Sequence, residues 1–332
     1  AFEDRFLIAD IEMRAAFPSE RWFWFDPPFH EGRSALLHKQ PDDIWRIDLQ
    51  LGPSADPTHE KRPDVVIPRL ARMLGHRDFD LEWVSVYTFQ CRRLERFVHG
   101  RAIFAGDAAH QVSPFGARGA NSGIQDAENL AWKLAAVVKG EAPPALLDTY
   151  DLERGQAADE NIGHSTRSTD FIAPRTTAER LFRDATLDLA AHADFAKRFV
   201  NSGRLSTPTA YDTPLTTPDA DRFGGVARLG APMPDAPLRT SAGEPVWLLD
   251  RLGKDFTVVC CAGDAAPQSF SGARTLVVGD DPTDAEGLLA RRLDASPGAV
   301  YLVRPDRHLC ARWRTGDPDA VARAVERALA RA

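Results

Sequence analysis

The sequence predicts an α/β protein, with an α+β region built around a sheet and a smaller α/β domain at the carboxy-terminal end. Strand-like segments follow one another at the start of the chain. In the middle, a short apolar strand leads through a glycine-rich loop into a long amphipathic helix. Further strands and a closing helix fill the last third. The 332 residues provide room for about two domains of roughly 150 residues each.

The composition is that of a globular protein and excludes several classes. Hydrophobic residues make up 43% of the chain and charged residues 27%. The formal net charge of −7 argues against a nucleic-acid-binding face, and no apolar run approaches the ~20 residues of a membrane helix. We expect no signal peptide from the first residues, which alternate apolar with charged. The four cysteines lack C-x-x-C spacing, so we expect no metal site, no disulfide scaffold and a cytoplasmic protein.

The opening segments predict three or four strands of an antiparallel or mixed sheet. Apolar and aromatic residues fill positions 6–13, 21–25, 34–38 and 44–51. In the last of these, polar and apolar residues alternate, so that Arg46, Asp48 and Gln50 share one face. A short helix from Pro63 to Gly75 and a strand over residues 83–89 follow.

The stretch from 101 to 139 carries the most information about function. Residues 102–105 form a short apolar strand, which we expect to be buried on both faces. It ends at Gly106 and Asp107, at the place where open α/β sheets bind ligands. An ionised carboxylate there would accept hydrogen bonds from the hydroxyls of a sugar or polyol. Taken alone, a Gly-Asp pair after a strand is usually only a turn.

A loop with two glycines, residues 113–119, precedes the predicted helix. The helix is expected to pack through apolar residues at helical spacing and to end at Gly140. Its amino terminus faces the loop and would favour an anion or a developing negative charge. His110 is interpreted as a structural histidine. The apolar residues of the helix are Ile124, Ala127, Leu130, Ala131, Leu134, Val137 and Val138.

The run from Gly106 to Leu134 resembles the second FAD-binding motif of single-component, class A flavoprotein aromatic hydroxylases. Within that family it is most similar to the branch of 3-(3-hydroxyphenyl)propionate hydroxylase and phenol hydroxylase. The segments 22–26, 92–94 and 148–154 resemble the same family, so the likeness covers roughly residues 1–175.

The resemblance implies a set of FAD-binding residues. Asp107 would bind the ribityl chain, Pro114 and Phe115 would lie beside the isoalloxazine, and the residues after them would surround its pyrimidine edge. Ser113 stands where many members have proline, which predicts a slightly less rigid loop. No catalytic residue is singled out. The implied cofactor-binding set is Gly106, Asp107, Pro114, Phe115, Gly116, Ala117, Arg118, Gly119, Ala120 and Asn121.

The resemblance also implies the reaction. NADPH or NADH reduces FAD, O2 adds to form a flavin C4a-hydroperoxide, and one oxygen atom is transferred to a phenolic ring. Candidate substrate contacts are Phe23, Phe25, His38 and Gln40, although core packing is the alternative interpretation of the aromatic ones. The alternatives are an epoxidase- or halogenase-like flavoprotein, and a non-catalytic interaction protein with a thioredoxin-like domain.

The first FAD motif of the family, a G-x-G-x-x-G that binds the ADP half, is absent from these 332 residues. We therefore expect the chain to correspond to the carboxy-terminal two-thirds of a flavoprotein. On its own it would not retain stoichiometric FAD, because half a site offers too few contacts.

The remaining chain is predicted to be helical and then α/β. Four regions are expected: a substrate-binding sheet over 1–95, the FAD-binding part with helices over 96–203, a linker over 204–237 and a thioredoxin-like domain over 238–332. That domain would serve packing or homodimer formation, with Cys260 and Cys261 as core residues. The anchors of the helices at 178–200 are expected to be Leu181, Phe182, Ala185, Leu189, Phe195 and Phe199.

Overall fold

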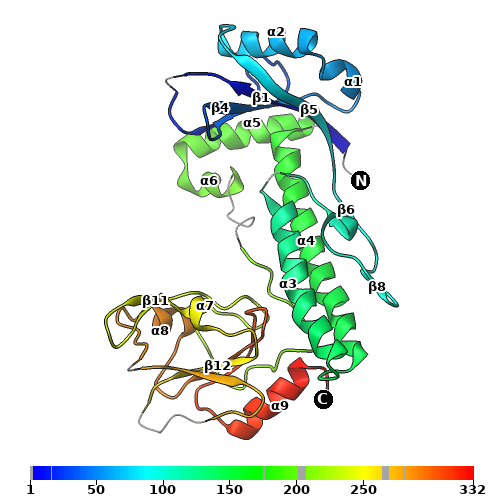
Figure 1. The fold of residues 1–332 in the computed structure, drawn as a ribbon. Coiled ribbons are helices and arrows are strands. Elements are labelled where there is room, and N and C mark those ends of the chain that lie inside the picture. Colours follow the sequence, from blue (N-terminus) through cyan, green and yellow to red (C-terminus); the bar gives the residue numbers. More distant parts are fainter. Residues whose placement is uncertain are drawn as a thin grey trace. The chain divides into compact units, whose positions relative to one another are not determined.

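The computed structural model describes residues 3–15, 17–114, 116–174, 176–200, 207–263, 269–279 and 281–332. Unit 1 comprises Ala1–Arg93, His110–Gly119 and Asn161–Ser206, and unit 2 comprises Leu94–Ala109, Ala120–Glu160 and Thr207–Ala332. Both units contain strands and helices (Figure 1), so the α/β class is confirmed. The region boundaries at 95, 203 and 237 stay a prediction.

Unit 1 is built on a five-stranded antiparallel sheet with the strand order β2-β3-β4-β1-β5. All the strands expected in the first 90 residues are present. Two helices, α1 (Pro57–Glu60) and α2 (Pro63–Leu74), cover one face of the sheet (Figure 1). The strands are β1 (Glu3–Glu12), β2 (Arg21–Trp24), β3 (Ala35–Lys39), β4 (Ile44–Gln50) and β5 (Asp80–Gln90).

The helix-covered face of this sheet forms the core of unit 1. The predicted alternation along β4 places Trp45, Ile47 and Leu49 on that face, where none is more than 1% exposed. Helix α2 buries Val66 and Leu70 in the same cluster. Since side chains alternate along a strand, the polar residues of β4 point to the opposite face.

The short strand expected over residues 102–105 is shorter and more exposed than predicted. In unit 2, β7 (Val98–His99) and β8 (Ala102–Ile103) form a hairpin, and the 3-10 turn η1 (Gly106–Ala108) follows. Ala102 and Phe104 are exposed, so the expectation of burial on both faces is wrong. The reason is that β8 pairs only with β7 among the described residues.

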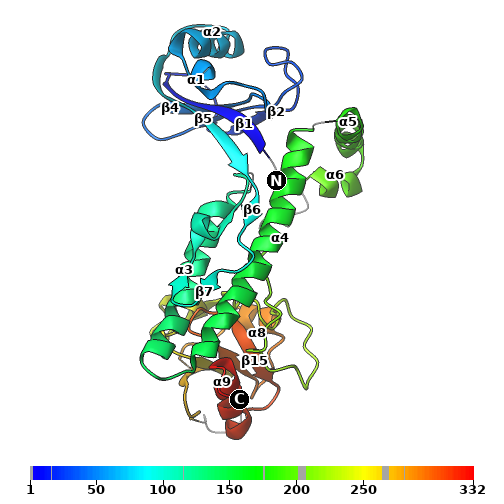
Figure 2. The same ribbon diagram turned by 90° about the vertical axis from the view of Figure 1, so that its right-hand side faces the viewer.

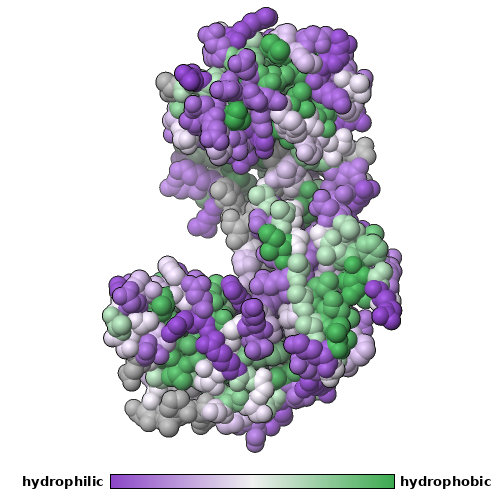
Figure 3. All heavy atoms as spheres, in the orientation of Figure 1, coloured by the Kyte–Doolittle hydropathy of each residue, from purple (hydrophilic) through white to green (hydrophobic). Residues whose placement is uncertain are grey.

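Helices α3 (Arg118–Val138) and α4 (Asp148–Ile172) run side by side (Figure 2) and are joined through η2 (Pro144–Leu147). The expectation that α3 packs through its apolar residues holds only for Leu130 and Val137, which contact buried clusters. It is wrong for the others, of which Ile124 and Val138 are 67% and 77% exposed. Apolar side chains accordingly reach the surface around α3 (Figure 3). The buried side chains of α3 are Ser122, Asp126, Asn129, Lys133 and Ala136.

Helices α5 (Thr177–His192) and α6 (Asp194–Val200) belong to unit 1. Their predicted anchors are wrong. Helix α5 instead buries Arg183 and Thr186. The guanidinium of Arg183 lies 5.6 Å from the ring centre of Phe25, and this cation–π contact takes the place of the expected apolar packing. The exposed residues that were expected to be anchors are Leu181, Phe182, Ala185, Leu189, Phe195 and Phe199.

The carboxy-terminal part of unit 2 contains a four-stranded sheet with the order β13-β12-β14-β15. Strands β12 and β13 are parallel, whereas β14 is antiparallel to both of its neighbours. The expected strands, hairpin and closing helix are present, but residues 248–251 form a helical turn. Its elements are β10 (Pro237–Arg239), β11 (Pro245–Trp247), α7 (Leu248–Arg251), β12 (Thr257–Cys261), β13 (Arg274–Val278), α8 (Leu288–Leu293), β14 (Val300–Val303), β15 (Leu309–Trp313) and α9 (Pro318–Ala328).

The segment from 207 to 236 is an extended arm that packs on this sheet domain. Ala227 and Met233 belong to its core cluster. Cys260 is buried and Cys261 is half-buried. Burial raises the pKa of the Cys260 thiol to about 11 and that of Cys261 to about 12. Both thiols are therefore protonated at neutral pH, as befits small packing residues.

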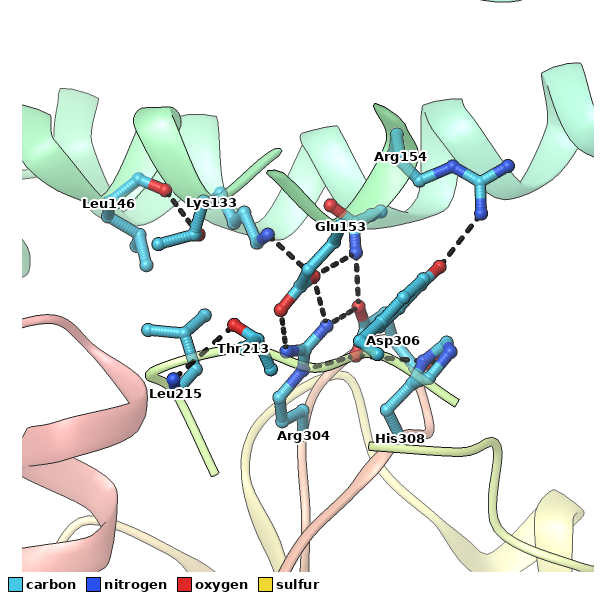
Figure 4. A network of polar contacts seen from close by, with 12 residues as sticks. Lys133, Leu146, Glu153, Arg154, Thr213, Leu215, Arg304, Asp306 and His308 are labelled. Atoms are coloured by element: carbon cyan, nitrogen blue, oxygen red, sulfur yellow. Dashed lines mark hydrogen bonds and ion pairs between the residues drawn. The ribbon is translucent and has the colours of Figure 1, made fainter. Parts of the chain in front are cut away.

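A cluster of buried charged and polar side chains connects α3 and α4 with the end of β14 (Figure 4). The carboxylate of Glu153 on α4 accepts hydrogen bonds from Lys133 Nζ at 2.8 Å and from Arg304 at 2.6 and 2.9 Å. Arg304 Nε also donates to Asp306 at 2.9 Å, and Asn129 donates to both carboxylates. None of the five residues is more than 3% exposed.

The charges of this cluster depend on one another. Burial alone would raise the pKa of Glu153, but Arg304 and Lys133 outweigh it and hold that pKa below its ordinary value. Burial lowers the pKa of Lys133 to about 8 against the attraction of Glu153. Removing the charge of Glu153 would thus leave two cations buried without their shared partner.

We predict that Glu153→Gln lowers the free energy of unfolding by about 3–5 kcal/mol, the typical cost of breaking a buried ion pair. Urea unfolding, followed by the change in tryptophan fluorescence, measures this change. Glu128→Gln, an exposed change on α3, should stay within about 0.5 kcal/mol of the wild type. Equal stability of the two variants would contradict the role given to Glu153.

Candidate functional site

The sheet face opposite α2 bears a cavity of about 300 Å³, within unit 1. This volume is at the lower end of the range for small-molecule sites. Aromatic side chains contribute much of its lining, and Pro114 from the glycine-rich loop also lines it. Its aromatic residues are Phe6, Phe23, Trp83, Tyr87 and Phe89. Such a lining suits an aromatic ligand, because flat rings bury large area at low cost in conformational entropy.

Three charged side chains also line the cavity: Arg21, Arg46 and Asp48. Arg46 forms a two-pronged pair with Asp10, at 2.8 and 2.7 Å. Asp48 has no such partner. Its Oδ1 is buried and makes no hydrogen bond with any described residue. Burial raises the pKa of Asp48 to about 6, although Arg46 and Arg21 act in the opposite direction.

The strand register explains why Asp48 stays unpaired. In the sheet, Asp48 lies between Leu36 of β3 and Ile8 of β1, and neither side chain can donate a hydrogen bond. Arg46, two residues away on the same face, is already held by Asp10. Asp48 is thus a carboxylate at the wall of an aromatic cavity, with acceptor capacity to spare.

The residue before Pro114 is fixed by α4. The hydroxyl of Ser113 lies 2.9 Å from that of Thr169, and its carbonyl accepts a hydrogen bond from the Ser165 hydroxyl at 3.1 Å. The backbone N–H of Ser113 donates to the Cys91 sulfur. Ser113 is fully buried. The expectation that serine makes this loop less rigid is therefore not supported, since these bonds fix the residue that a second proline would otherwise stiffen.

The rest of the loop turns sharply into α3. Gly116 and Ala117 have positive φ angles of 98° and 53°, and the Ala117 N–H donates to the Pro114 carbonyl at 2.9 Å. A left-handed alanine is uncommon, so this turn is closely specified. The guanidinium of Arg118 donates to Asn161 at 2.8 Å, which ties its charge to α4. Phe115 lies outside the described residues.

Asp107 is exposed in η1, and a buried ion pair in unit 2 fixes the backbone next to it. Asp126 on α3 accepts a hydrogen bond from the Gly106 N–H at 2.8 Å and from Arg154 Nε at 2.6 Å. A Cβ at Gly123 would touch the Gly106 Cα at 3.5 Å, so η1 lies close against α3. The Asp126–Arg154 pair therefore determines where Asp107 is presented.

These parts suit a flavin nucleotide, each within its own unit. The exposed Asp107 offers a carboxylate to polyol hydroxyls. Gly119 and Ala120 lie in the first turn of α3, where backbone N–H groups lack partners within the helix, and Asn121 follows them. Their contacts with FAD, and those of the other loop residues, stay a prediction.

The candidate substrate contacts named from the sequence do not all share one place. Phe23 lines the cavity, whereas Phe25 packs against Phe171 and Arg183. His38 lies on the same sheet face, beside Arg46 and Arg21 in the strand register. Its pKa is lowered by burial and by those two cations. Gln40 lies at the turn before β4, where its N–H bonds the Ile44 carbonyl.

Sequence reasoning missed Asp48 as a candidate. The available signal was a carboxylate on the polar face of a strand, near its middle. Acidic residues are disfavoured in strands. The support of Ser113 by Ser165 and Thr169 was also missed. It could not be found from sequence, because more than 50 residues separate these partners.

Two features are absent from the described residues. No group of three or more His, Cys, Asp or Glu side chains there could hold a metal ion. None of the helices in that part of the chain has both the length and the apolar character that a membrane span requires.

Comparison with known proteins gives a consistent family. Residues 9–165 match the family model described as FAD binding domain. The 3-(3-hydroxy-phenyl)propionate/3-hydroxycinnamic acid hydroxylase of Mycolicibacterium vanbaalenii is 34% identical over 302 residues, which cover 80% of this chain and 51% of that protein. The chain spans about half the length of the curated relatives it matches.

Solved structures share the fold. The flavin-dependent monooxygenase PieE, solved in complex with FAD and substrate, superposes with a TM-score of 0.76 at 22% identity, covering 99% of this chain and 66% of that one. The Diels-Alderase PyrE3 of pyrroindomycin biosynthesis superposes with a TM-score of 0.66 at 26% identity, covering 98% and 62%. At 22% identity, the likeness to PieE concerns the fold alone.

We predict that Asp48→Asn stabilises the protein at neutral pH. The folded state holds the Asp48 proton up to a pKa of about 6, against an ordinary value of 3.8. Stability from this group is therefore complete below the ordinary value and is lost as pH rises through about 6. Near pH 7.5 the variant should gain about 1–3 kcal/mol, and near pH 4 the gain should vanish.

Chemical unfolding at the two pH values measures the difference. Asp43→Asn is the matched control, because Asp43 is an exposed residue in the turn before the same strand. A gain from Asp48→Asn that is equally large near pH 4 would contradict the assignment of the raised pKa to Asp48.

Proposed function

We propose that this chain belongs, through residues 9–165, to the FAD-binding domain family of class A flavin monooxygenases, and that it is part of a hydroxylase of phenolic compounds. The observation that carries the proposal is the aromatic-lined cavity of unit 1 with Pro114 at its wall. By family resemblance, Pro114 begins the loop beside the flavin ring. A ring bound in this cavity would therefore lie next to the flavin.

The proposed division of labour follows from this placement. Bound FAD supplies the oxygen-transfer chemistry, with NADPH or NADH as reductant and O2 as oxidant. The cavity side chains bind and orient the aromatic substrate and keep water away from it. Ser113, held by α4, positions Pro114 at the cavity. Asp107 and the first turn of α3 would hold the ribityl chain and the pyrimidine edge of the flavin.

Two finer statements belong to the same proposal. A cytoplasmic location is supported by the free thiols of all four cysteines, which suit a reducing compartment. We assign a role in homodimer formation to the predicted thioredoxin-like region. The sheet of that region carries no paired cysteines.

Different chemistry on the same flavoprotein fold is the second candidate. The likeness to PyrE3, which is described as a Diels-Alderase, supports this second candidate. The two candidates differ in their product, because only a hydroxylase adds an oxygen atom to the ring.

We predict that the intact, FAD-loaded enzyme of which this chain is part oxidises NADPH or NADH faster when a phenol such as 3-(3-hydroxyphenyl)propionate is added. Mass spectrometry with isotopically labelled O2 should then find one labelled oxygen atom in the product. A product with the mass of the substrate but a new carbon skeleton would favour the second candidate. An FAD-loaded protein that leaves every phenol unchanged would refute hydroxylation.

We predict that Asp107→Ala, made in the intact enzyme, weakens FAD binding about ten- to a hundredfold, because a ribityl hydroxyl of the flavin loses its charged acceptor. Titration of the protein with FAD, followed by flavin fluorescence, measures the change. Asp188→Ala, which removes an exposed carboxylate on α5, is the control and should leave the affinity unchanged. If both variants bind FAD like the wild type, Asp107 does not contact the cofactor.

A further inference from the structure

The unpaired carboxylate of Asp48 lines the cavity and has no role in the proposed function. It stands between apolar side chains, with Phe23 and Leu36 on one side and Ile8 on the other. Its Oδ1 is buried without a hydrogen-bond partner among the described residues. A buried acceptor left unsatisfied costs free energy, and a ligand that donates a hydrogen bond would recover it.

The surrounding charges indicate what kind of donor the cavity accepts. Arg21 and Arg46 also line it, and Arg46 forms an ion pair with Asp10. These two guanidinium groups disfavour a cationic ligand, such as a protonated amine, beside Asp48. A neutral O–H group carries no such penalty and donates one hydrogen bond.

On the basis of the proposed function, we propose that Asp48 determines substrate specificity by accepting a hydrogen bond from the ring hydroxyl of a neutral phenol. The carboxylate would select hydroxylated rings over the same ring without a hydroxyl. It would also fix the orientation of the ring in the cavity, because the direct neighbours of Asp48 across the sheet, Leu36 and Ile8, are apolar and offer no competing acceptor. A site built around a polar acceptor rejects ligands that leave it unpaired.

The bond should depend on pH. The ionised carboxylate is purely an acceptor, whereas the protonated acid carries a proton on one of its oxygens. The raised pKa, near 6, places this change within an accessible range. Other charged or titratable groups on this sheet face are Asp10 and Glu12 of β1, Arg21 of β2, His38 of β3, Arg46 of β4 and Tyr87 of β5.

Calorimetric titration with a matched pair of ligands tests the proposal. The ligands are 3-(3-hydroxyphenyl)propionate and 3-phenylpropionate, which differ only in the ring hydroxyl. Near pH 7.5 the wild type should bind the hydroxylated ligand at least about tenfold more tightly. In Asp48→Leu the ratio of the two affinities should fall to about one, while 3-phenylpropionate still binds. That retained binding shows that the cavity of the variant is folded.

The pH dependence provides a second readout. In the wild type, the preference for the hydroxylated ligand should grow as pH rises from about 5 to about 7, as Asp48 ionises. In Asp48→Asn the preference should be independent of pH, because an amide does not titrate. The ratio of the two ligands removes the effects of His38 and the other groups, which act on both. Asp43→Asn should keep the wild-type profile.

The outcomes separate this inference from the function it rests on. If the wild type binds both ligands equally, or if Asp48→Leu keeps the preference, Asp48 is not the hydroxyl acceptor, while the cavity remains an aromatic site. If the wild type binds neither ligand, the cavity is not the aromatic site, and both proposals fail.

Discussion

Two buried carboxylates on the α3–α4 helix pair determine where the functional segments of unit 2 lie. Asp126 is held by Arg154 and in turn holds the Gly106 N–H, so that the turn bearing Asp107 is fixed to the helix. Glu153 is held by Lys133 and Arg304 and ties the same helix pair to the end of β14. In a dry interior each carboxylate needs its cation, and each pairing therefore specifies one arrangement of the elements that contribute to it.

The two faces of the sheet in unit 1 have different roles, one in stability and the other in binding. One face packs against α2 through large apolar residues and forms the core. The other bears the aromatic cavity, with Asp48 between apolar side chains. Residues that serve binding are often held in states that the fold itself would not favour. The unpaired, partly desolvated Asp48 fits this pattern, whereas Arg46 on the same face is neutralised by Asp10.

The position of the glycine-rich loop depends on residues that lie outside its own sequence. Its conformation follows from the two left-handed residues Gly116 and Ala117. Its anchoring comes from Ser165 and Thr169 of α4, which hold Ser113. The hydroxyl groups of these residues thereby fix the position of Pro114. Many family members are expected to fix this position with a second proline instead. A loop supported in this way presents a rigid surface to the cavity without needing apolar packing of its own.

The sequence by itself determined the strands of both sheets, the end of α2 at Gly75 and the Gly106–Leu134 motif. These features depend on neighbours within a few residues, through alternation, capping and glycine conformation. It also determined the helical spacing along α3 and α5, but not which face would be buried. The tertiary structure alone decided that α3 buries Asp126 and Lys133 while Ile124 is exposed, and that Arg183 replaces the apolar anchors of α5. It alone left Asp48 without a partner, because burial and pairing depend on side chains that are distant in sequence and meet only in the fold.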